Sequence, residues 1–91
     1  METNEKLLVM DKILRELEET KNAEAIVVKK LAELESENRS LGDRWLETKL
    51  PEIFNLMDDA LGATMDLQTE YTVVRNKFVK DNKLDEMNEE R

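Results

Sequence analysis

Apolar residues recur at helical spacing along most of this chain, and it contains few residues that would interrupt a helix. Only two Gly and one Pro occur in 91 residues, whereas sheet-rich folds need many tight turns rich in both. Steps of three and four residues between apolar positions are typical of one face of an α-helix. The sequence therefore predicts an all-α protein.

The first helical pattern covers residues 5–41. In a heptad frame with Met10 at position a, positions a and d are mostly apolar, and position e adds further apolar residues. The resulting stripe is wider than the two-position seam of a simple coiled coil. Position a holds Met10, Leu17, Leu31 and Asn38; position d holds Ile13, Thr20, Val27, Leu34 and Leu41; position e holds Leu7, Leu14 and Val28.

A break is predicted after this pattern, at Gly42 and Asp43. Gly suits the left-handed conformation that follows a helix end, and Asp is a favoured N-cap. The connection is expected to span residues 42–49, with Thr48 capping the next helix. Pro51 then falls in the first helical turn, where a missing N–H costs nothing.

The second helical pattern covers residues 50–80 and repeats the same three-position stripe. Position a holds Leu50, Met57, Thr64, Tyr71 and Phe78; position d holds Ile53, Ala60, Leu67 and Val74; position e holds Phe54 and Leu61. Two patterns of similar length joined by a short connection predict an antiparallel hairpin of two long amphipathic helices over residues 1–80. Residues 81–91 are mostly polar and are predicted to form an acidic, flexible tail.

Stripes three positions wide require more cover than one neighbouring helix provides, and small cores are marginal. We therefore expect a homo-oligomer, most simply a dimer that forms a four-helix bundle or coiled coil, or pairing with another helical protein. Leu31→Asp and Leu67→Asp are both expected to abolish the oligomer. The residues expected to mediate self-association are Ile13, Leu17, Val27, Leu31, Leu34, Ile53, Met57, Leu67, Tyr71, Val74 and Phe78.

The chain lacks both His and Cys. This removes the commonest general acid–base and metal-binding side chains, and every Ser-His, Cys-His and thiolate-zinc site. We therefore expect a non-enzymatic protein-binding protein with no catalytic residue, metal or cofactor. No segment approaches the roughly 20 apolar residues of a membrane span, and no signal peptide is recognised, so a soluble cytoplasmic protein is expected.

Acidic residues are concentrated in one part of a chain whose net charge is −8. This charge disfavours direct binding to nucleic acid or to anionic membranes. Acids near a helix start and bases near its end also suit the helix dipole, which is the structural explanation. The functional alternative is an inhibitor or DNA mimic, for example phage-encoded, that masks a basic nucleic-acid-binding partner. The acids between Lys49 and Arg75, a window without any base, are Glu52, Asp58, Asp59, Asp66 and Glu70.

Asn38 and Trp45 each allow a structural and a functional interpretation. Asn38 occupies position a, where a buried Asn can fix the register of paired helices, unless it lies at a fraying helix end near Gly42. Trp45 is the sole Trp. Because Leu46 and Leu50 are close to it in the sequence, it is expected to pack in the core at the end of the hairpin rather than to be an exposed anchor.

Overall fold

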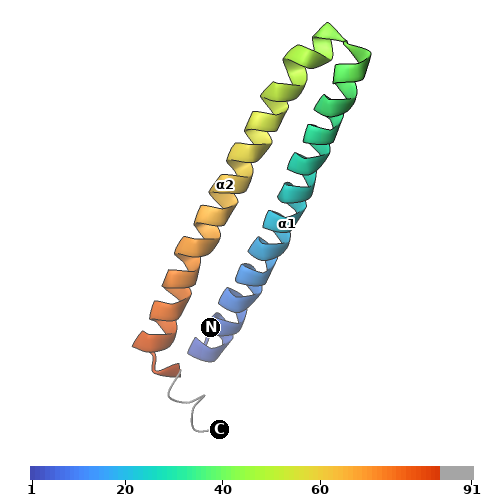
Figure 1. The fold of residues 1–91 in the computed structure, drawn as a ribbon. Helices are drawn as coiled ribbons and strands as arrows, with labels where there is room; N and C mark the ends of the chain where they lie inside the picture. Colours follow the sequence, from blue (N-terminus) through green and yellow to red (C-terminus); the bar gives the residue numbers. More distant parts are fainter. Residues whose placement is uncertain (85–91) are drawn as a thin grey trace.

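The computed structural model describes residues 1–84, which form a hairpin of two long helices. These are α1 (Thr3–Leu41) and α2 (Arg44–Asp81), and this part of the chain contains no strand. Figure 1 shows α1 and α2 side by side, with the N-terminus and the end of α2 at the same end of a rod. The rod measures 63 × 20 × 19 Å. The predicted all-α helical hairpin is therefore confirmed.

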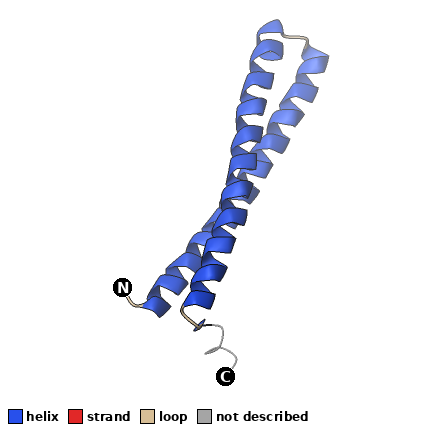
Figure 2. Cartoon of the chain, turned by 90° about the vertical axis from the view of Figure 1, so that its left-hand side faces the viewer, coloured by secondary structure: helices blue, strands red, loops and turns tan. Residues whose placement is uncertain are grey.

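The connection is much shorter than the predicted residues 42–49, because it consists of Gly42 and Asp43 alone. Gly42 adopts the left-handed conformation at φ 72°, and its N–H donates to the Asn38 carbonyl oxygen at 2.6 Å. The Asp43 carboxylate accepts from the Leu46 N–H at 2.9 Å, which makes Asp43 the N-cap of α2. Figure 2 shows this short connection between two continuous helices.

Asn38 fixes the connection through both atoms of its side-chain amide. Its Nδ2 donates to the Asp43 carbonyl oxygen at 3.0 Å, and its Oδ1 accepts from the Asp43 N–H at 3.1 Å. The side chain is buried, with 7% of its surface exposed. Asn38 therefore neither frays nor pairs with another position a, because its amide satisfies the backbone of the turn.

The earlier start of α2 changes the surroundings of three residues. Pro51 lies inside the helix instead of in its first turn. The Thr48 hydroxyl does not cap a helix but donates to the Arg44 carbonyl oxygen at 3.1 Å. Trp45 is 67% exposed, so the expectation of a core Trp was wrong. The physical reason is that Asp43 caps the helix directly, which leaves Trp45 in the first turn at the tip of the hairpin.

The C-terminal end of the hairpin also extends further than predicted. Asp81 is still helical, and after Lys83, which has a φ of 57°, Leu84 is buried with 5% exposure. Residues 81–84 are therefore part of the hairpin rather than of a flexible tail. The remaining residues of the predicted acidic tail, 85–91, lie outside the described part of the chain.

The contact between the helices is built mainly from positions a and e of both heptad patterns, with Ala60 from position d and Val79 from position b. No side chain in residues 1–84 is fully buried, and the most buried apolar residues are Leu31, Val79 and Leu84. No helix in this part of the chain is long and apolar enough to cross a membrane. The other apolar residues with restricted exposure at positions a and e are Leu7, Met10, Leu14, Leu17 and Val28 in α1, and Leu50, Phe54, Met57, Leu61, Tyr71 and Phe78 in α2.

Candidate interaction face

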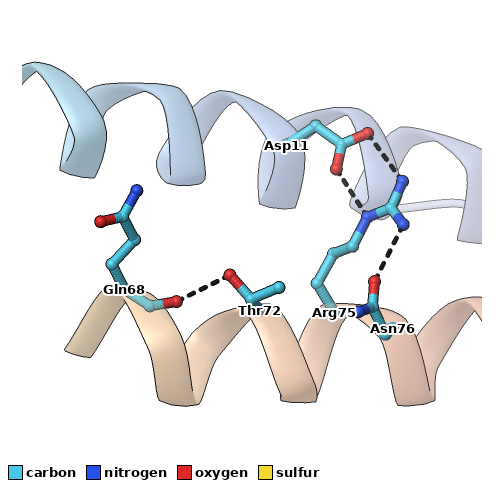
Figure 3. A network of polar contacts seen from close by, with 5 residues as sticks. All are labelled: Asp11, Gln68, Thr72, Arg75 and Asn76. Atoms are coloured by element: carbon cyan, nitrogen blue, oxygen red, sulfur yellow. Dashed lines mark hydrogen bonds and ion pairs between the residues drawn. The ribbon is translucent and has the colours of Figure 1, made fainter. Parts of the chain in front are cut away.

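Polar side chains of α1 and α2 contact each other along one side of the hairpin. The Arg75 guanidinium donates from Nε to Asp11 Oδ1 at 2.8 Å and from a terminal nitrogen to Oδ2 at 3.4 Å. Gln68 donates from Nε2 to the Glu18 carboxylate. Figure 3 shows Arg75 reaching from α2 to Asp11 on α1. The step from Asp11 to Glu18 is seven residues forward along α1, and the step from Arg75 to Gln68 is seven residues backward along α2. These contacts therefore define the antiparallel register.

Charges also occur within this seam. Lys21 lies 3.0 Å from Glu18, and Gln68 and Lys21 together hold the pKa of the Glu18 carboxyl below its ordinary value. Glu24 and Glu35 each have a buried carboxylate oxygen that lacks a hydrogen-bond partner within residues 1–84. An unsatisfied buried polar atom costs about 1–3 kcal/mol. The seam within one hairpin is therefore only partly apolar.

The opposite side of the hairpin carries an apolar surface, which we call the d face. Its side chains occupy position d, and all are substantially exposed, from 39% at Leu34 to 71% at Leu41. The single polar residue at position d between Ile13 and Val74 is Thr20. The d face consists of Ile13, Val27, Leu34 and Leu41 from α1, and Ile53, Leu67 and Val74 from α2.

The antiparallel arrangement brings the two d rows to the same side. In each helix, position d lies next to position a, on the side opposite position e. Both d rows are therefore rotated away from the contact between the helices by about the same angle. Because paired helices face each other and run in opposite directions, equal rotations point both rows to one side. The register places Ile13 beside Val74 and Leu34 beside Ile53. The d face is therefore continuous along the rod.

The d face ends in an apolar hollow near the turn, with a volume of about 340 Å³. Leu34, Leu41, Leu46 and Leu50 line it, with Glu37 and Asn38 at its edge. A second hollow of about 400 Å³ lies on the polar side of the same end, next to Glu35 and Pro51. The exposed Trp45 is close to both in the sequence. The end of the hairpin nearest the turn is thus less tightly packed than a protein core.

The structure divides the residues expected in self-association into two groups. Five lie at position a, where they have restricted exposure next to the other helix: Leu17, Leu31, Met57, Tyr71 and Phe78. Six lie at position d on the d face: Ile13, Val27, Leu34, Ile53, Leu67 and Val74. The sequence pattern identified both rows but did not show which row pairs within one hairpin.

The predicted acidic surface lies on the outer side of α2, and all five residues are exposed. Helical spacing aligns Glu52, Asp59 and Asp66 at position c in a stripe that faces away from α1, and Glu70 at position g borders this stripe. Asp58 is rotated by about 100° from this stripe, because it directly precedes Asp59 in the helix. Lys49 lies 3.8 Å from Glu52, which partly neutralises one end of the stripe.

Comparisons with protein-family models, curated proteins and solved structures find no match for this chain. No cluster of three or more His, Cys, Asp or Glu side chains in residues 1–84 has an arrangement that could hold a metal ion. The d face is therefore the candidate site on which a functional proposal can rest.

Proposed function

We propose that this protein is a non-enzymatic interaction protein whose hairpins pair through the d face to form a four-helix bundle. The proposal rests on which heptad positions face the other helix within the hairpin. Position e includes Lys21, Glu35, Gln68 and Arg75, yet it lies within the hairpin, whereas the more apolar position d is exposed. A hairpin that had to be stable alone would gain more by burying position d.

The geometry of a four-helix bundle explains this choice. In such a bundle each helix contacts two neighbours, and its two most apolar rows point toward the bundle centre between them. Position e then faces the neighbour within the hairpin, where Arg75 and Gln68 make their contacts. Positions a and d face the centre, and position g faces the second hairpin. Pairing through the d face would bury the position a side chains more completely as well.

The accessible surface of a single chain is larger than that expected for a compact monomer, which supports the presence of a partner. Its accessible surface is 7178 Å², whereas a compact monomer of 10.7 kDa is expected to expose about 5,500 Å². Large contiguous apolar patches on soluble proteins usually mark interaction sites. A second copy presents a surface of the same length and the same apolar character, so twofold pairing would cover both d faces at once.

Two neighbouring valines give a matched test of this proposal. Val74→Asp is expected to convert a dimer into a monomer, because Val74 lies on the d face with 51% exposure. Val73→Asp should leave the dimer intact, because Val73 is 65% exposed and points to the outer side of the same helix. Light scattering after size exclusion measures the mass of each variant. A wild-type monomer, or equal behaviour of the two variants, would reject pairing through the d face.

A second candidate function is the masking of a basic partner by the acidic stripe of α2. The supporting observation is that Glu52, Asp59 and Asp66 align at position c on the outer side of α2, which pairing through the d face leaves accessible, and Glu70 at position g borders them. An arginine-rich peptide is a suitable probe, and binding should weaken steeply as salt is raised.

Replacing these four acids by Gln or Asn should weaken binding of the peptide and leave the helicity unchanged. The matched control neutralises three acids of α1 and the N-cap residue before it (Glu5, Glu19, Glu33 and Glu2), which removes the same charge from the other half of the hairpin. Equal losses in the two variants, measured by calorimetric titration, would mean that only net charge matters and that the stripe is not a specific site.

A further inference from the structure

We infer that dimerisation is coupled to proton uptake by Glu24, so that the dimer becomes more stable as the pH falls. This inference rests on the proposed pairing through the d face and concerns the regulation of that same interface. Glu24 occupies position a, between the contact within the hairpin and the d face. One of its carboxylate oxygens is buried and has no hydrogen-bond partner within residues 1–84.

The polar residues of rows a and d lie together near the middle of the rod. In residues 13–34 of α1 and 50–78 of α2, these rows are apolar or aromatic except at Thr20, Glu24 and Thr64. The antiparallel register places Thr64 opposite residue 22, between Thr20 and Glu24. Residue 22 is also the midpoint of α1. The surface that pairs in the proposed dimer therefore carries one polar layer at half its length, with apolar residues on both sides.

This polar layer meets its own copy in either twofold arrangement of two fully overlapping hairpins. An axis along the rod keeps each level in place, whereas an axis across the middle exchanges levels that are equally far from residue 22. Glu24 is two residues from that level, which is about 3 Å along the helix. The two Glu24 side chains are therefore separated along the rod by at most about 6 Å in both arrangements.

The basic residues of α1 nearest to Glu24 are engaged with other acids. Lys21 is one helical turn before Glu24, but its ammonium lies 3.0 Å from the Glu18 carboxylate. Lys30, at position g on the edge of the proposed interface, lies 3.5 Å from Glu33. Within residues 1–84, no Lys or Arg forms an ion pair with Glu24.

The other elements around Glu24 do not supply a positive charge either. On α2, the residues at its level in rows a, d and e are Ala60, Leu61 and Thr64, none of which ionises. The Thr20 hydroxyl donates to the Glu16 carbonyl oxygen at 2.8 Å, so its proton is already used. The second copy adds the same residues, and its charged group at this layer is its own Glu24.

Bringing two such carboxylates together favours a proton shared between them. Like charges in one site resist simultaneous ionisation, and removal from water adds to this effect. The dimer then binds more protons than two separate chains, so its stability increases as the pH falls and is lost as the pH rises. Each proton taken up changes Kd by about tenfold per pH unit. Uptake of one proton should lower Kd by at least about tenfold between about pH 7.5 and pH 5.5.

Glu24→Gln tests the coupling directly, because it replaces the carboxylate by a neutral group of the same shape. Sedimentation equilibrium across this pH range, with a chelator present, measures Kd for the wild type and the variant. At about pH 7.5 the variant should have a Kd about tenfold lower than the wild type. The two values should converge at the acidic end of the range, because the wild-type pair is then protonated.

Glu35→Gln is the matched control. Glu35 also has a buried carboxylate oxygen without a hydrogen-bond partner within residues 1–84, but it lies at position e, away from the d face. The change removes the same charge, so the variant should keep the pH dependence of the wild type. It therefore accounts for the general loss of repulsion as a chain with a net charge of −8 is titrated. Circular dichroism verifies that each variant remains helical.

The outcomes separate this inference from the proposed function. A dimer whose Kd depends on pH equally in both variants overturns the inference, while the d face remains the interface. A weaker dimer in Glu24→Gln at about pH 7.5 also overturns it, because the ionised carboxylate would then make a favourable contact. A wild-type monomer at every pH and concentration overturns the proposed function itself, and this inference with it.

Discussion

Leu31→Asp is expected to abolish the hairpin itself, with loss of most of the helical signal. Leu31 is 9% exposed and is the most buried apolar residue of α1. Truncating a buried leucine typically costs about 2–5 kcal/mol, and placing an unpaired carboxylate in the seam adds a desolvation cost. Small domains have total stabilities of about 5–15 kcal/mol. Far-ultraviolet circular dichroism and a thermal melt measure the effect.

Two variants show whether the loss arises from the seam. Ile26→Asp makes the same chemical change on the outer side of α1, where Ile26 is 69% exposed, and should leave the melt nearly unchanged. Leu67→Asp lies on the d face and should remove the dimer while retaining more helix than Leu31→Asp. If Leu31→Asp kept the wild-type melt, the observed seam would be wrong.

The different outcomes expected for Leu31 and Leu67 show where sequence reasoning reached its limit. Helical spacing, few helix breakers and the Gly42–Asp43 pair were sufficient to predict two helices and an antiparallel hairpin. The stripe, however, had apolar residues on both sides of position a. Either row d or row e could have faced the other helix, and apolar character alone would have favoured row d.

The contacts that decide this choice involve residues far apart in the sequence. Arg75 contacts Asp11, and Gln68 contacts Glu18, only when position e of α2 faces the other helix. Asp11 had a nearby partner, Arg15, one helical turn away, which made a local pair the simpler expectation. Local spacing cannot show that the distant pair forms instead.

The connection was mispredicted for a different reason. Thr48 and Pro51 resemble the start of a helix, and this local signal favoured a late start for α2. In the structure, the amide of Asn38 holds the backbone of Asp43 at 3.0 and 3.1 Å, so the turn is complete before Arg44. A side chain five residues away thus determines where α2 begins, and it leaves a proline inside the helix.

Pro51→Ala is therefore expected to stabilise the hairpin. A proline in a helix interior lacks a donor for the carbonyl four residues earlier, here that of Glu47, and is about 3 kcal/mol less favourable than alanine. Its stiffness in the unfolded chain returns about 1 kcal/mol of this cost. The net gain is expected to be about 2 kcal/mol, and the melting temperature should rise by about 10 °C in a domain of this size.

The gain must be separated from the general preference of helices for alanine. Asn55→Ala replaces an exposed residue one turn later in α2 and should contribute only about 0.5 kcal/mol through helix propensity. Chemical denaturation of both variants compares the two effects at one temperature.

Pro51 also lines the hollow of about 400 Å³ on the polar side of the turn end. If Pro51→Ala instead lowered the stability, proline would have to hold α2 in the position that Asn38, Asp43 and the seam require. The turn end would then depend on the proline ring as well as on the amide of Asn38.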